Sequence, residues 1–325
     1  MYLAHSDYAS PMTFTPSGHQ PVLLAQTLAV LAPERGGTFL DCTFGGGGHT
    51  RALLEASPNV TVVALDCDPA AAERAASLEA EYPGRLHFYG INFRKLDTTN
   101  HQPYAGVLMD LGVSSFQLDQ RDRGFSFRGE ADADMRMDTR SGPTAAAFLE
   151  TAPEADLVRA IRDYGEEKSW RRVVNRILES RGTGLLARTD TLADLIASAV
   201  TRPRGKPARI HPATQSFQGI RIAVNRELET LEEALPLAMS TLAPEGILAV
   251  ITFHSLEDRI VKRFFRRMAG RPEHAGDSRA QQDRLVQAAL IQTRPMVAGD
   301  DEILHNPRSR SAKLRALRKK GEDPL

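Results

Sequence analysis

The chain has 325 residues, with 41 Lys and Arg against 41 Asp and Glu, 42% hydrophobic residues and two cysteines. This composition is typical of a globular protein of up to two domains and excludes a disordered chain or a fibre. Cys42 and Cys67 are too few for a disulfide framework, and no C-x-x-C spacing offers a zinc site. No apolar run reaches the ~18–20 residues of a membrane span, and residues 1–18 lack a signal-peptide pattern, so we expect a cytoplasmic protein.

The first third of the chain alternates short strands with helices. Strands are predicted at 38–41, 61–66, 86–89 and 106–110. Helices are predicted from residue 48 and over 69–81, the latter with Asp68 as its N-cap and Pro69 in the first turn. This alternation predicts βαβ units, and therefore a parallel sheet with helices on both faces.

The middle of the chain is helical in pattern. No strand of similar quality appears until 246–253, which follows a long helical segment at 220–242. We therefore expect an all-helical domain at 111–217, inserted between two parts of the sheet domain at 1–110 and 218–325. Residues 270–277 have the composition of a flexible loop. Helices are predicted inside the insertion at 145–150, 154–164, 169–181 and 190–200.

Charge is unevenly distributed along this neutral chain. Basic residues cluster at 202–209, 262–267 and 308–320, whereas 227–233 is acidic. Such clusters are typical of phosphate contacts, although each alone also fits a solvated face. The last cluster is interpreted as a basic C-terminal tail, and Arg202, Arg204 and Lys206 as cations that contact the phosphates of a nucleic acid.

A glycine-rich loop follows the first strand. Gly45-x-Gly47 continues into Gly48 and His49 without the third glycine of the dinucleotide fingerprint, so a nicotinamide cofactor is disfavoured. The spacing D-x-x-x-G-x-G from Asp41 instead fits the loop with which class I methyltransferases hold S-adenosylmethionine. Asp66, at the end of the second strand, is placed to accept hydrogen bonds from ribose hydroxyls. Phe93, after the third strand, offers a ring face to adenine or belongs to the core.

Two further strands end in candidate catalytic residues. Asp110 ends the fourth strand and His254 the fifth, and ligands of open α/β sheets bind beyond these carboxyl ends. Asp110 is a candidate acceptor for a substrate amine. His254 is a candidate for orienting a base or taking up a proton, or it only pins the helix that Ser255 and Asp258 begin.

These motifs together resemble the RsmH (MraW) family. The resemblance implies a class I, Rossmann-like methyltransferase with an inserted helical domain. It also implies methylation of N4 of a decoding-centre cytosine in bacterial 16S ribosomal RNA, as free RNA or within the small subunit. Cys67 departs from the more usual basic or polar residue. The segments that carry the resemblance are 19–24, 41–49, 65–69, 109–115, 123–127, 134–138, 211–217, 253–259 and 306–310. The family's cofactor contacts would fall on Gly47, Gly48, His49, Asp66, Phe93, Asp110 and Gln117.

Two other functions remain open on sequence grounds. A DNA cytosine-N4 or adenine-N6 methyltransferase is disfavoured because Leu111-Gly112-Val113 replaces the Pro-Pro-Tyr that usually stacks on the flipped base. A non-enzymatic RNA-binding module would not bind S-adenosylmethionine tightly. The residue that stacks on the base is then expected among Phe116, Phe125, Phe127 and Phe253.

Overall fold

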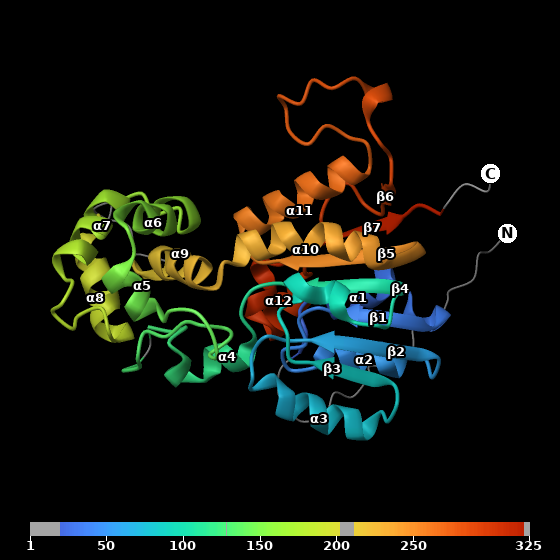
Figure 1. The fold of residues 1–325 in the computed structure, drawn as a ribbon, viewed down its shortest axis with the longest axis horizontal. Helices are drawn as coiled ribbons and strands as arrows, with labels where there is room; N and C mark the ends of the chain where they lie inside the picture. The colour runs from blue at the N-terminus through green and yellow to red at the C-terminus, as the bar shows by residue number, and fades with distance from the viewer. Residues whose placement is uncertain (1–19, 128, 202–210, 322–325) are drawn as a thin grey trace.

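The computed structural model describes residues 20–127, 129–201 and 211–321. A sheet with helices on both faces forms one part, and a group of helices stands beside it (Figure 1). Among the described residues, no helix is long and apolar enough to cross a membrane. The basic cluster at 202–209 lies outside the described residues.

The sheet has seven strands in the order β3-β2-β1-β4-β5-β7-β6. The first five are parallel, and β7 runs antiparallel to both of its neighbours. The predicted strands and the predicted doubly wound arrangement are confirmed. The strands are β1 (Gly37–Asp41), β2 (Val60–Leu65), β3 (Leu86–Tyr89), β4 (Tyr104–Asp110), β5 (Leu242–Thr252), β6 (Ala288–Leu290) and β7 (Lys313–Lys319).

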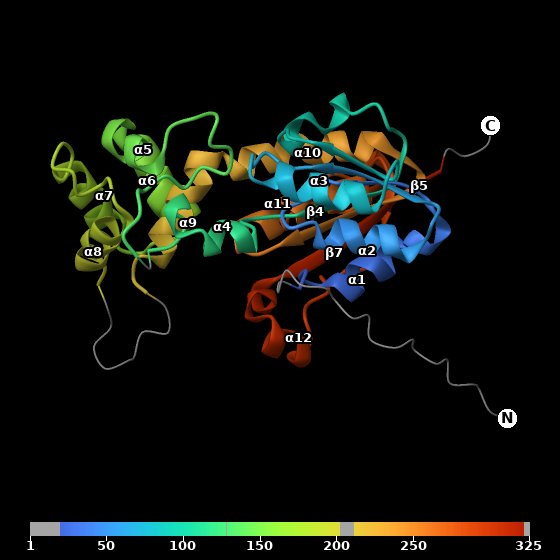
Figure 2. The same cartoon turned by 90° about the horizontal axis from the view of Figure 1, so that it is seen from below.

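Two hydrophobic layers hold the helices on the sheet. On one face, α1 (Leu24–Leu31), α2 (Gly48–Ala56) and α3 (Ala71–Glu81) pack over β1 and β2. On the other face, α10 (Glu227–Thr241) and α11 (Ser255–Met268) cover β4 and β5. Figure 2 shows these layers edge-on, with α12 (Asp300–His305) on the α1 side. The short α4 (Ser115–Asp119) follows β4.

The second group of helices has its own core. Leu149, Val173, Ile177, Leu192 and Ile196 are among its fully buried side chains. The four helices predicted here are present, although the second continues as a π-helix at 159–164. The helices are α5 (Ala145–Thr151), α6 (Glu154–Val158), α7 (Trp170–Glu179), α8 (Thr189–Ala199) and α9 (Thr214–Asn225).

The long helix predicted at 220–242 is two helices. α9 and α10 are separated at Arg226, whose φ of 51° is left-handed. Phe217 and Ile220 of α9 pack into the core of the helical group. The boundary predicted between 217 and 218 therefore falls within α9, and the chain returns to the sheet domain at Arg226.

The ends of two other predicted elements are corrected. β5 begins at Leu242, four residues earlier than predicted, because a register shift opposite β4 and a left-handed Glu245 accommodate the Pro-Glu-Gly segment. The prediction of a basic C-terminal tail is wrong, since 313–319 form β7. Apolar Leu314, Ala316 and Leu317 are buried there. The cation of Arg315 lies 2.8 Å from Asp258 on α11.

Candidate active site

A crevice lies beyond the carboxyl ends of the parallel strands. Its walls are the glycine loop after β1, the ends of β2 and β4, the segment through α4, and the start of α10. Met137 and Asn225 contribute from the side of the helical group. The crevice thus lies where the sequence predicted ligand binding, with the helical group forming one wall.

Hydrogen bonds to the Asp41 carboxylate hold the glycine loop in place. The carboxylate accepts hydrogen bonds from Thr50 Oγ1 at 2.7 Å and from the Thr43 amide at 3.0 Å. Gly47 has a φ of 77° and caps α2, and a Cβ there would lie 2.8 Å from the Phe44 ring. Asp41 and Gly47 therefore shape the loop. The crevice itself is lined by Gly45, Gly46, Gly48 and His49.

Asp66 lies in the crevice at the end of β2. Its Oδ2 accepts the Gly45 amide at 2.7 Å and its Oδ1 accepts the Asp68 amide at 2.8 Å. Burial raises the pKa of Asp66 to about 6. Each carboxylate oxygen can accept a further hydrogen bond, so the position suits a ligand with adjacent hydroxyl groups.

Phe93 and Gln117 also line the crevice. Phe93 begins the short 3₁₀ segment at 93–98, with Asn92 as its cap. The amide of Gln117 is engaged by the protein: Nε2 donates to Asp68 at 2.9 Å and Oε1 accepts the Ser114 amide at 3.0 Å. Its side chain fastens α4 against the β2 end, and a direct cofactor contact by Gln117 stays a prediction.

Asp110 lines the crevice at the end of β4. Thr43 Oγ1 accepts the Asp110 amide at 2.7 Å, which anchors the end of β4 to the glycine loop. Its Oδ2 lies 3.5 Å from His49 Nε2. Its buried Oδ1 has no hydrogen-bond partner among the described residues. A buried unsatisfied acceptor is costly, so this oxygen is suited to a donor on a ligand.

His254 is the N-cap of α11. Its Nδ1 accepts the Glu257 amide at 3.5 Å, and Glu257 Oε2 accepts the Phe253 amide at 2.8 Å. The helix start is as predicted, but His254 and Glu257 form the capping box, whereas Asp258 pairs with Arg315. Phe253 and Glu257 line the crevice and the His254 ring does not, so a catalytic His254 stays a prediction.

Sequence reasoning missed an ion pair at the α9–α10 junction. Arg221 donates to both oxygens of Glu227 at 2.8 Å, and Glu227 lines the crevice. Burial would lower the pKa of Arg221, but the charge of Glu227 raises it. The pair depends on the break at Arg226, which a continuous helical pattern conceals.

The structure places the four aromatic candidates for base stacking at two different locations. Phe116 and Phe253 line the crevice. Phe125 and Phe127 pack against the core of the helical group, where the Phe127 ring stacks on His211 at 4.5 Å. The candidates are therefore reduced to Phe116 and Phe253.

The sheet order with a reversed β7, the glycine loop after β1 and the acid after β2 define an S-adenosylmethionine-dependent methyltransferase of class I. Residues 16–320 match the model of the MraW methylase family. The chain belongs to this family.

Curated relatives are similar in sequence to this chain along nearly its whole length. The ribosomal RNA small subunit methyltransferase H of Gluconobacter oxydans is 46% identical over 94% of each chain. The protein of the same name from Rhodopseudomonas palustris (strain CGA009) is 47% identical over 91% of this chain and 89% of its own. Among solved structures, an rRNA methylase from Streptococcus thermophilus aligns over 91% of this chain and 95% of its own, at 11% identity and a TM-score of 0.40.

Proposed function

We propose that this protein transfers a methyl group from S-adenosylmethionine to the N4 amine of a decoding-centre cytosine in 16S ribosomal RNA. The observation that carries the proposal is the position of Asp110. Its unpartnered Oδ1 lies at the end of β4, in a crevice walled by the glycine loop and by the helical group. The names of the curated relatives support the small-subunit RNA as substrate.

The residues of the crevice fit the cofactor. Asp66 is placed to accept ribose hydroxyls, Phe93 offers a ring beside the adenine position, and the loop at 45–49 lies close enough for backbone contacts. When bound, S-adenosylmethionine supplies a methyl group on a positively charged sulfur.

Asp110 acts on the accepting amine. Cytosine N4 is a poor nucleophile because its lone pair is delocalised into the ring. A hydrogen bond from the N4 amine to Asp110 Oδ1 returns electron density to the nitrogen. Holding the amine and the methyl group in line can supply ~7–11 kcal/mol of the barrier. The protein thus contributes alignment together with one acceptor.

The cytosine must leave its stack to reach Asp110. Phe116 and Phe253 border the space in which a flipped base would lie. The Phe116 ring is held against the glycine loop by the Arg74 guanidinium, 4.5 Å from its centroid. Phe253 directly follows β5 and lies beside Gly112, which has no side chain to fill the space. These contacts favour Phe253 as the ring that stacks on the base.

Mass spectrometry of nucleosides tests the proposal. Unmodified 16S RNA, assembled small subunits and duplex DNA are each incubated with the protein and S-adenosylmethionine. We expect one N4-methylcytidine in the ribosomal RNA, and Phe253→Leu should lower the yield more than Phe125→Leu. Methylation of the DNA alone would favour the alternative methyltransferase, and no methylation of any substrate would contradict both.

A further inference from the structure

The outward face of α11 consists of cations. Its inward side chains Val261, Phe264 and Phe265 are buried against the sheet. On the side of the helix turned away from these residues, five positions that recur at helical spacing are all basic. These positions are Arg259, Lys262, Arg263, Arg266 and Arg267.

Three of these cations have no partner among the described residues. Arg259, Lys262 and Arg263 are exposed and form no ion pair or side-chain hydrogen bond with the part of the chain that the structure describes. Arg267 lies 3.6 Å from Glu273, and Arg266 donates to the Pro272 carbonyl. We call Arg259, Lys262 and Arg263 the α11 triad.

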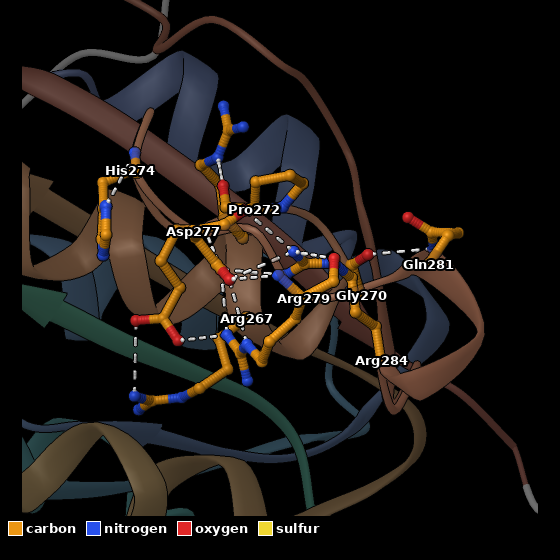
Figure 3. Close-up of polar contacts among 11 residues, drawn as sticks. Arg267, Gly270, Pro272, His274, Asp277, Arg279, Gln281 and Arg284 are labelled. Carbon is orange, nitrogen blue, oxygen red and sulfur yellow. Dashed lines mark hydrogen bonds and ion pairs between the residues drawn. The ribbon is translucent and has the colours of Figure 1, made fainter.

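In the loop after α11, by contrast, arginines are paired with acidic side chains (Figure 3). Asp277 accepts hydrogen bonds from Arg279 at 3.0 Å and from Arg284 at 2.9 Å. These hydrogen bonds hold the pKa of Asp277 well below its usual range. Arg279 and Arg284 are thus paired within the loop at 270–284, whereas the triad is left uncompensated.

Neighbouring acids do not neutralise the triad either. On α11 itself, Glu257 is engaged by His254 and Asp258 by Arg315. On the adjacent α10, exposed Glu233 pairs with Arg94, and no ion pair joins α10 to α11 within the described residues. Like charges four residues apart, as in Arg259 and Arg263, destabilise a helix, so folding alone gives no reason for this arrangement.

The triad follows the end of α11 that borders the crevice. Glu257, on the first turn of α11, lines the crevice from the buried side of the helix, and Arg259 follows two residues later on the exposed side. Ser255 Oγ donates to Glu166 Oε2 at 2.8 Å, which joins the start of α11 to the helical group. The three cations span about 6 Å along the helix axis, in the turns next to this crevice-lining start of α11.

We propose that the α11 triad binds backbone phosphates of the ribosomal RNA strand that carries the target nucleotide. This inference rests on the proposed function and adds the surface by which the strand is held. Phosphate groups are bound through charge and require no base-specific geometry, so unpaired Lys and Arg side chains on a rigid helix are able to bind them. The contacts would hold the strand in register while one base enters the crevice.

A triple variant, Arg259→Gln/Lys262→Gln/Arg263→Gln, tests the surface. Its affinity for unmodified 16S RNA is measured by filter binding between about 50 and 300 mM salt. We expect binding at least about tenfold weaker than wild type near 150 mM. The slope of log K against log salt should fall by about 2, since each phosphate contact on a single strand contributes roughly 0.7. S-adenosylmethionine affinity should not change and the melting temperature should not fall, because the triad touches neither the cofactor loop nor the core and its removal relieves like-charge repulsion on α11.

A matched control removes the same charge from the other end of the parallel strands, away from the crevice. Arg35, Arg318 and Lys320 are exposed there, and changing all three to Gln should leave RNA affinity within about twofold. Lysine acetylation gives a direct readout, with Lys262 protected by bound RNA and Lys320 reactive. If the two triple variants bind RNA equally and Lys262 stays reactive, the surface is wrong, although wild-type methylation would still support the function. If wild type neither binds nor methylates 16S RNA, whether free or in the assembled small subunit, both proposals are overturned.

Discussion

His49 Nε2 lies 3.5 Å from Asp110 Oδ2, so an ion pair joins the first turn of α2 to the end of β4. Burial would lower the pKa of His49. The nearby negative charges of Asp110 and Asp41 outweigh that effect, and the pKa is raised. The floor of the crevice therefore holds a pair whose charge depends on pH.

The first prediction concerns stability against pH. A histidine whose pKa is raised by folding stabilises the fold fully below its unfolded pKa of ~6.5, and this stabilisation disappears as pH rises through the folded pKa. Compared with wild type, His49→Gln should therefore lower the melting temperature more at pH 6 than at pH 9. Asp110→Asn should show the same trend. A difference that does not vary with pH would contradict the ion pair.

The second prediction separates the two possible functions of Asp110. Asp110→Asn keeps the shape of the side chain but weakens it as an acceptor. If the carboxylate acts on the amine in the transition state, the single-turnover methylation rate should fall by about 10²-fold or more, and cofactor affinity should change much less. The rate is measured by rapid quench and the affinity by calorimetry. A parallel loss of both would assign Asp110 to cofactor binding.

The third prediction concerns Asp66. Burial raises its pKa to about 6, so cofactor affinity should weaken as pH falls below that value and the carboxylate is protonated. Asp66→Ala should lose roughly 1.5–3 kcal/mol of binding free energy at pH 7.5. Calorimetry from pH 5.5 to 7.5 measures both effects. Unchanged binding by Asp66→Ala would remove Asp66 from the site.

The reach of sequence reasoning follows from the physical signals involved. Strands β1 to β5 and most helices could be predicted because apolar periodicity reflects burial directly. The positions of Asp66 and Asp110 at strand ends could be predicted for the same reason. The break at Arg226 was not predictable, since a left-handed non-glycine residue interrupts a helical pattern without changing it. The sequence predicts a tail at β7 because its four Arg and Lys residues outnumber the three buried Leu and Ala residues among them.

The fourth prediction tests how α9 is joined to the helical group. A Cβ on Gly219 would lie 2.6 Å from the Gly165 amide nitrogen and closer still to the Ala160 carbonyl oxygen. Gly219→Ala should therefore overpack this contact and destabilise the protein by about 1–3 kcal/mol, measured by chemical denaturation. Gly299→Ala is the control, because a Cβ there meets no atom within 4 Å. Equal stability of the two variants would contradict the close packing of α9.

The last prediction decides between structure and chemistry at His254. Its ring caps α11 and lies 3.2 Å from Glu257, so His254→Ala should cost ~0.5–2 kcal/mol of stability. Asn is a preferred N-cap residue, so His254→Asn should recover most of that loss. A catalytic histidine would instead give a slow single-turnover rate in both variants. Thermal melts and single-turnover rates distinguish the cases. If the Asn variant melts like wild type and methylates at the wild-type rate, His254 is a cap, and Asp110 is the acceptor on which the chemistry depends.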